Sequence, residues 1–134
     1  MTQENPINEG NYYDKYNSKN PIERGIMRRF FNSLSATLKK LQPKRILDVG
    51  CGEGYMTNYL YDLYNGKTDI QGIDQGEKVI ENAKKAYPHI KFETGDIYCA
   101  ADRSEKYGLI TCFEVLEHLK RPRKALEELR KIGD

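Results

Sequence analysis

The sequence predicts an α/β fold, a Rossmann-like doubly wound parallel sheet covered by helices on both faces. Short apolar runs at 45–50, 69–74, 90–95 and 107–113 alternate with segments of helical periodicity. A glycine-rich turn follows the first apolar run and leads directly into a helical pattern. Strands that alternate with helices of this length need right-handed crossovers, and these make the strands parallel.

The first expected element is a long amphipathic helix that begins at Pro21. Asn20 is a suitable N-cap, and proline is favoured at the first helical position. Apolar residues then recur every three or four positions as far as Leu41, and Pro43 ends the pattern.

Three shorter helices are expected at 55–64, at 77–87 and from Pro122 onward. Each has apolar residues on one face, which should point toward the sheet. The residues expected to be buried are Met56, Tyr59, Leu60, Leu63, Val79, Ile80, Ala83, Tyr87, Ala125, Leu126, Leu129 and Ile132.

Length and composition favour one domain at 20–134, preceded by an N-terminal arm at 1–19 that carries Tyr12, Tyr13 and Tyr16. The net charge is only +2 among 42 charged side chains (22 plus 20), so no overall field points to a nucleic acid. No apolar run approaches the ~20 residues of a membrane span, and the N-terminus is polar. We therefore expect a cytoplasmic protein that does not enter the membrane.

The three cysteines, Cys51, Cys99 and Cys112, are scattered and lack C-x-x-C spacing. We expect free thiols and no zinc site.

The segment Asp48-Val49-Gly50-Cys51-Gly52-Glu53-Gly54 indicates a site for an adenosine-type cofactor. Glycine allows sharp turns and close approach of a ligand, and the helix that follows begins with unpaired N–H groups. A dinucleotide fingerprint would need glycine at position 55, which is Tyr55, and no phosphate-loop lysine follows. NAD and ATP are therefore disfavoured, and a glycine-rich turn without a ligand is the other interpretation.

Acidic residues follow the next two predicted strands. Asp74 lies twenty positions after Gly54 (74 minus 54), where a carboxylate can accept hydrogen bonds from both ribose hydroxyls. Asp96 ends the third apolar run, although a Gly95-Asp96 turn would also explain it.

These segments together resemble the class I S-adenosylmethionine-dependent methyltransferases. The resemblance implies a cofactor, S-adenosylmethionine or its product S-adenosylhomocysteine, and methyl transfer to an acceptor that the sequence does not identify. It also implies a seven-stranded sheet of order 3-2-1-4-5-7-6, of which this chain has the strands in order 3-2-1-4. The cofactor-binding residues implied are Gly50, Cys51, Gly52, Asp74, Gln75, Asp96, Ile97, Phe113 and Glu114.

Besides cofactor binding, the run Glu114-x-x-Glu117-His118 allows two other functions, metal binding and general base catalysis. On a helix the three side chains would share a face and form a possible cation site, as in the RNA 2′-O-methyltransferases that carry a similar run. A fourth ligand is missing from the sequence, so we predict that no metal is bound. His118 alone is a candidate general base.

The resemblance ends after the helix that follows the fourth strand. We therefore expect a truncated methyltransferase domain, and the lack of three strands can make it inactive by itself. A small-molecule acceptor is the expected partner, and a nucleic acid is less favoured. The basic groups Lys120, Arg121, Arg123, Lys124 and Arg24, Arg28, Arg29 are interpreted as solvated helix faces. A homodimer through the exposed fourth strand is predicted, and a non-catalytic cofactor- or partner-binding module is the alternative function.

Overall fold

The computed structural model describes residues 18–134. Tyr12, Tyr13 and Tyr16 lie outside the described residues. The chain divides into two compact units, one ending at Lys40 and the other spanning Leu41–Asp134.

The first unit contains helix α2 (Pro21–Leu38). The Asn20 side chain accepts a hydrogen bond of 3.0 Å from the Ile22 N–H, as expected for an N-cap. The helix ends three residues before Leu41 (41 minus 38), so the apolar pattern continues slightly beyond the helix. No helix in residues 18–134 is long and apolar enough to cross a membrane.

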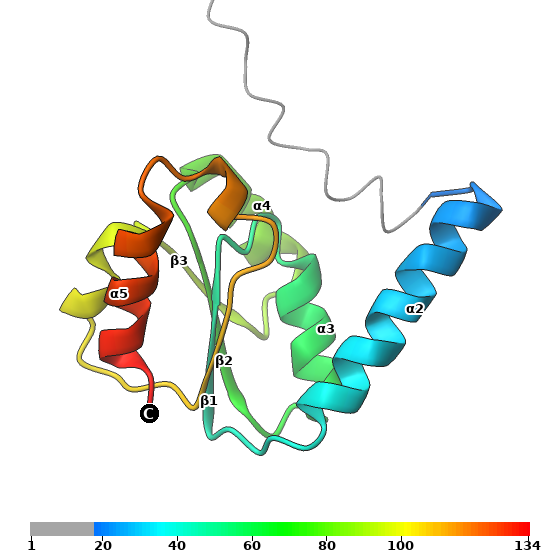
Figure 1. The fold of residues 1–134 in the computed structure, drawn as a ribbon, viewed down its shortest axis with the longest axis horizontal. Coiled ribbons are helices and arrows are strands. Elements are labelled where there is room, and N and C mark those ends of the chain that lie inside the picture. Colours follow the sequence, from blue (N-terminus) through cyan, green and yellow to red (C-terminus); the bar gives the residue numbers. More distant parts are fainter. Residues whose placement is uncertain (1–17) are drawn as a thin grey trace, which may run out of the picture. The chain divides into compact units, whose positions relative to one another are not determined.

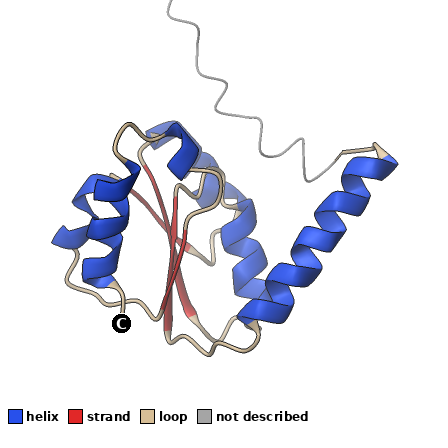
Figure 2. Ribbon diagram, in the orientation of Figure 1, coloured by secondary structure: helices blue, strands red, loops and turns tan. Residues whose placement is uncertain are grey.

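The second unit alternates strands with helices, and its helices lie on both sides of the sheet (Figures 1 and 2). Its elements are β1 (Arg45–Val49), α3 (Tyr55–Leu63), β2 (Asp69–Asp74), α4 (Glu77–Ala86), β3 (Lys91–Thr94), the 3-10 helix η1 (Ile97–Asp102), β4 (Leu109–Thr111), the 3-10 helix η2 (Leu116–His118) and α5 (Pro122–Ile132).

The sheet has the order β3-β2-β1-β4, and every pairing is parallel. This confirms the predicted fold class and strand order. In the register of the central strand, Asp48 stands opposite Gly72 of β2 and Thr111 of β4. Because the strands are parallel, all their carboxyl ends meet at one edge of the sheet.

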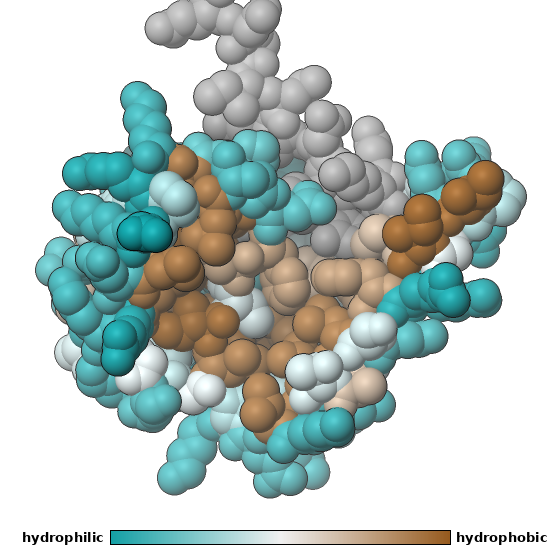
Figure 3. Space-filling view, viewed as in Figure 1, coloured by the Kyte–Doolittle hydropathy of each residue, from teal (hydrophilic) through white to brown (hydrophobic). Residues whose placement is uncertain are grey.

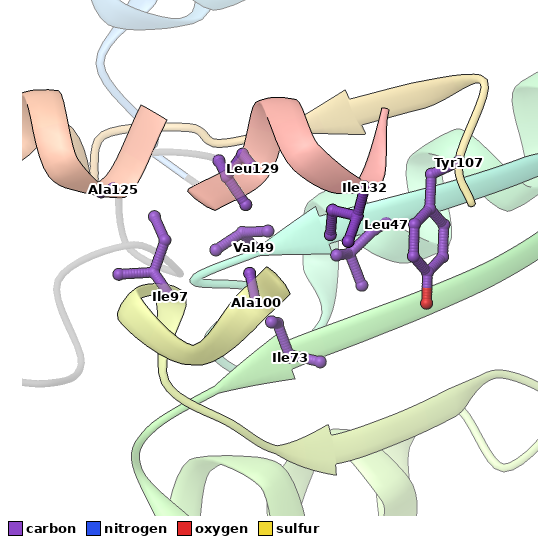
Figure 4. Packing of buried hydrophobic residues seen from close by; sticks show 9 residues of the cluster. All are labelled: Leu47, Val49, Ile73, Ile97, Ala100, Tyr107, Ala125, Leu129 and Ile132. Atoms are coloured by element: carbon purple, nitrogen blue, oxygen red, sulfur yellow. The ribbon is translucent and has the colours of Figure 1, made fainter. Parts of the chain in front are cut away.

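Two hydrophobic clusters, one on each face, hold the helices to the sheet. The larger cluster packs α5 and η1 against the strands (Figure 4), and the smaller one lies beneath α4. Such packing favours folding by about 25 cal/mol for each Å² of apolar surface removed from water. The larger cluster comprises Leu47, Val49, Ile73, Ile97, Ala100, Tyr107, Ala125, Leu129 and Ile132.

Several sequence predictions about burial and length were wrong in detail. Leu126 is 49% exposed, because the buried face of α5 runs through Ala125, Leu129 and Ile132 and leaves Leu126 at its side. The fourth strand covers only Leu109–Thr111, because Glu114 takes a positive φ of 51° and the chain leaves the sheet. Four residues expected to be buried are half-buried: Tyr59, Leu63, Val79 and Tyr87.

The outer edge of the sheet at β4 begins with a short contact to the end of α5. Tyr107 forms a parallel bridge with Gly133, in which Tyr107 N–H donates to Ile132 O at 2.9 Å and Asp134 N–H donates to Tyr107 O at 3.0 Å. Beyond that bridge Leu109, Ile110 and Cys112 are half-buried. Figure 3 shows hydrophobic residues gathered over the middle of the second unit.

Candidate functional site

The loop between β1 and α3 can be formed only by residues that tolerate a left-handed backbone. Gly50, Gly52 and Gly54 have φ values of 69°, 53° and 88°. A Cβ on Gly50 would lie 2.2 Å from Val115 Cγ2, and one on Gly54 would lie 2.6 Å from Phe92 Cζ. A Cβ on Gly52 would meet nothing within 4 Å. The loop is therefore packed at both ends and open at its centre.

Backbone hydrogen bonds hold this loop against the end of β2. The N–H groups of Gly50 and Cys51 both donate to the carbonyl oxygen of Ile73, at 2.8 and 3.0 Å. Gly54 N–H donates to Cys51 O at 3.0 Å, which closes the turn before α3.

Asp74, the last residue of β2, bridges the open part of this loop to the next turn. Its Oδ2 accepts from Gly52 N–H at 3.0 Å, and its Oδ1 accepts from Gly76 N–H at 2.9 Å. The structure therefore brings together Gly52 and Asp74, two predicted site residues that are 22 positions apart. The following residue, Gln75, is exposed.

Beneath the loop, the buried carboxylate of Asp48 joins three elements. Its Oδ2 accepts from Thr57 Oγ1 at 2.7 Å and its Oδ1 from Thr111 Oγ1 at 2.8 Å, so β1 is linked to both α3 and β4. Asp48 is 1% exposed, and burial raises its pKa from 3.8 to about 6 against the smaller, lowering effect of the two hydroxyls.

Sequence reasoning missed the roles of Thr57 and Thr111. The role of Thr57 could have been found from the sequence, because Thr57 is a polar residue on the inward face of a short amphipathic helix. The pairing with Thr111 depends on the strand register and leaves no local pattern.

The end of β3 places Asp96 and Ile97 in different surroundings. Asp96 is exposed and caps η1, with its Oδ1 accepting from Tyr98 N–H at 2.9 Å. The side chain of Ile97 is 7% exposed and belongs to the larger hydrophobic cluster, beside Val49 and Ala125 in Figure 4. Asp96 is thus the more accessible of the two predicted residues.

The segment after β4 does not form the α-helical turn on which the shared face of Glu114, Glu117 and His118 depends. Glu114 has a φ of 51°, and the 3-10 helix η2 begins only at Leu116. Glu114, Glu117 and His118 are exposed, whereas Phe113 is half-buried. Within residues 18–134 no group of three or more His, Cys, Asp or Glu side chains is arranged to hold a metal ion.

All three cysteines are free, as predicted. Cys51 is buried among the residues beneath α4, and burial raises its thiol pKa far above the usual range. Burial also raises the pKa of Cys112 to about 11. Both thiols stay protonated near neutral pH and are poor nucleophiles.

Comparison with known proteins identifies the family in which this combination occurs: a glycine loop, a carboxylate at a strand end and a parallel sheet of this order. The family model described as a methyltransferase domain matches residues 41–134. The chain belongs to the class I S-adenosylmethionine-dependent methyltransferases.

Curated relatives and solved structures agree with this family. The ubiquinone biosynthesis O-methyltransferase of Coxiella burnetii is 31% identical over 91 residues, which cover 65% of this chain and 38% of the relative. The malonyl-[acyl-carrier protein] O-methyltransferase of Halalkalibacterium halodurans is 27% identical over 123 residues, covering 86% and 45%.

The crystal structure of the plantazolicin methyltransferase BpumL, in complex with a pentazolic desmethylPZN analogue and SAH, superposes with a TM-score of 0.69 at 29% identity. The match covers 91% of this chain and 46% of BpumL. The chain thus spans less than half the length of each of these three relatives.

Proposed function

We propose that this chain binds S-adenosylmethionine or S-adenosylhomocysteine across the carboxyl ends of β1, β2 and β3, and that the protein transfers the methyl group to a small-molecule acceptor. The observation that carries the proposal is the open space at Gly52, the residue whose backbone N–H donates to the Asp74 carboxylate. Glycine there adds no side chain to that space and leaves it clear for a ligand.

The residues around that space fit an adenosine derivative. Asp74 Oδ1 and Oδ2 each keep a lone pair beyond their bonds to Gly76 and Gly52, so the carboxylate can accept from two ribose hydroxyls. Asp96 is exposed and can accept from an adenine amino group. By the family resemblance, the backbone of Ile97 would lie against the adenine ring, since its side chain is in the hydrophobic cluster.

The other predicted residues surround the loop. Gly50 and Cys51 turn the backbone toward the ligand, and Gln75, Phe113 and Glu114 line its outer side. These assignments follow the family resemblance, and the positions of their elements at one sheet edge support them.

For methyl transfer, these residues mainly need to position the cofactor. When bound, S-adenosylmethionine supplies a methyl group on a sulfonium that is already electrophilic. The chain holds the donor in place, and the rate comes from its alignment with the acceptor. A base is needed only for an acceptor that retains its proton, and His118, exposed after β4, is the proposed candidate.

The names of two relatives support a small-molecule acceptor, since they describe methyltransferases of ubiquinone biosynthesis and of plantazolicin. The third relative is named for a malonyl group on an acyl-carrier protein. We propose that residues outside these 134 complete the acceptor pocket.

Titration calorimetry with S-adenosylhomocysteine tests the cofactor part of the proposal. We expect saturable binding that excess NAD or ATP does not displace, because the loop lacks the glycine and lysine patterns of those sites. Competition by either nucleotide at micromolar concentration would overturn the assignment. Binding without single-turnover transfer of labelled methyl to a metabolite pool, in a protein that includes the acceptor pocket, would favour the non-catalytic alternative.

A further inference from the structure

Four positive side chains, Lys120, Arg121, Arg123 and Lys124, lie where helix α5 begins, and we call them the cationic rim. All four are exposed. The nearest acids along the chain are Glu117 before them and Glu127 after them. Within residues 18–134 no ion pair engages the rim. The rim is therefore a concentrated positive charge, of which only Lys124 is partly offset, through its electrostatic interaction with Glu128.

This charge has the opposite placement to the charges of helix α4. Helix α4 has Glu77 in its first turn and Lys84 and Lys85 in its last, which suits the helix dipole. Helix α5 has no acid in its first turn and no side-chain cap. Its cations repel the positive end of their own helix, so helix stability does not explain them.

Contacts join the rim to the edge of the sheet where the glycine loop lies. Arg121 N–H donates to Tyr98 Oη at 3.1 Å, and the Arg121 guanidinium lies 5.2 Å from the centre of the Tyr98 ring. Tyr98 N–H in turn donates to Asp96 at the end of β3. Arg121 is thus held in place from both its backbone and its side chain.

The loop that leads to the rim also reaches the glycine loop. Val115 occupies the space where a Gly50 side chain would lie, and His118 N–H donates to Val115 O at 3.0 Å. The rim therefore begins a few residues beyond the contact with the proposed cofactor site.

We propose that the cationic rim binds the oxyanion of the methyl acceptor, so that the protein selects small molecules that carry a carboxylate or phosphate group. This inference rests on the proposed function. Arginine and lysine bind such groups through charge-assisted hydrogen bonds, and a fixed arginine loses little freedom when it does so. The carboxylates of Asp74 and Asp96 mark the cofactor side of the same edge, which gives donor and acceptor regions of opposite charge.

A nucleic-acid partner fits the rim less well. Binding of single strands relies on aromatic side chains that stack on bases. Tyr98 has one face covered by Arg121, and residues 114–124 contain no Phe, Tyr or Trp.

Chemical-shift titration of the ¹⁵N-labelled 134-residue chain, saturated with S-adenosylhomocysteine, tests the inference with three probes. Phenyl phosphate and benzoate should shift the amide signals of Tyr98 and the rim in a saturable way, and uncharged benzyl alcohol should not. Comparing the two anions distinguishes phosphate from carboxylate recognition. Added salt should weaken both.

Two variants and one control assign the effect. Arg121→Gln should raise the dissociation constant of the preferred anion about tenfold, the scale of one charge-assisted hydrogen bond. The double variant Lys120→Gln/Arg123→Gln should also weaken binding while it leaves the Arg121–Tyr98 contacts intact. Lys84→Gln in the last turn of α4 removes the same charge elsewhere and should change nothing.

Equal weakening by Lys84→Gln, equal binding of benzyl alcohol, or shifts confined to other residues would overturn the inference. So would a short single-stranded oligonucleotide that binds more tightly than phenyl phosphate and is released by Arg121→Gln. Failure of S-adenosylhomocysteine to bind would overturn the proposed function instead, and the anion titration without cofactor still decides whether the rim holds an oxyanion.

Discussion

Single side chains at the carboxyl edge of the sheet shape the backbone that is proposed to hold the cofactor. Asp74 fixes the N–H groups of Gly52 and Gly76, and Asp48 fixes the hydroxyls of Thr57 and Thr111. One carboxylate lies beside the proposed ligand and the other beneath the loop, so their substitutions should have different effects.

Replacing Asp74 by alanine should weaken S-adenosylhomocysteine binding by about 1.5–3 kcal/mol, because hydrogen bonds to a charged group are lost. The matched control is Asp69→Ala, at the opposite end of the same strand, where the side chain is 67% exposed. Calorimetry on both variants measures the difference. Unchanged affinity in Asp74→Ala would remove this residue from the site.

Asp48 should make the stability of the chain depend on pH in a particular direction. Its carboxyl has a pKa of about 6 when folded against 3.8 as the ordinary value, so between these values the folded state holds a proton that the unfolded state has lost. Stability should therefore fall as pH rises from 4 to 6, by roughly 3 kcal/mol in all, and then stay level.

Denaturant unfolding of the parent chain and of Asp48→Asn across this range tests that expectation. The variant should lack the fall, since its amide does not titrate, and the difference between the two curves isolates Asp48 from other groups. Two parallel curves would contradict the burial effect. Asp69→Asn is the surface control.

The glycine loop and the segment after β4 pack against one another through Gly50 and Val115. Gly52→Ala places a Cβ in open space and should cost only the left-handed backbone strain, about 1–2 kcal/mol of unfolding free energy. Gly50→Ala should cost about 1–3 kcal/mol more because its Cβ meets Val115.

A double-mutant cycle measures this contact. Val115→Ala in the Gly50→Ala background should recover the steric part of the loss and leave the backbone part. Strict additivity of the two substitutions in chemical unfolding would show that the segment after β4 does not press on the loop. Gly52→Ala should instead act on cofactor affinity, which calorimetry would show.

The accuracy of sequence reasoning follows the range over which each signal acts. Helix starts at Pro21 and Pro122, the presence of four strands and the glycine loop are local patterns, and the structure confirms them, although β4 is shorter than predicted. Leu126 was placed wrongly because a neighbouring helical position shares the apolar pattern but not the packing. The hydrogen bond from Thr111 to Asp48 spans 63 positions, and no spacing rule within one segment predicts it.

The short strand β4 leaves one edge of the sheet free to pair with a strand of another copy of the chain. Gly108 N–H donates to Arg45 O of β1, so in the alternation of a strand the N–H of Leu109 points away from the sheet. Within residues 18–134 the only β-bridge on that edge is the one from Tyr107 to Gly133.

We predict a homodimer formed through this edge. Light scattering should show mass that rises toward twice the monomer value as concentration increases. Leu109→Pro removes the outward N–H and loses no hydrogen bond to β1, so it should return the chain to a monomer. Far-UV circular dichroism checks that the variant is folded. A parent chain that stays monomeric at all concentrations would contradict the prediction.

The Asp48 hydrogen bonds connect the glycine loop with the edge of the sheet. The same carboxylate holds Thr57 below the glycine loop and Thr111 within the edge strand. A ligand bound at the loop and a strand that pairs with β4 would act on one shared set of bonds, so we expect their binding free energies to be coupled. Thermodynamic reciprocity then requires that a strand at the edge changes cofactor binding by the same factor by which the cofactor changes pairing at the edge.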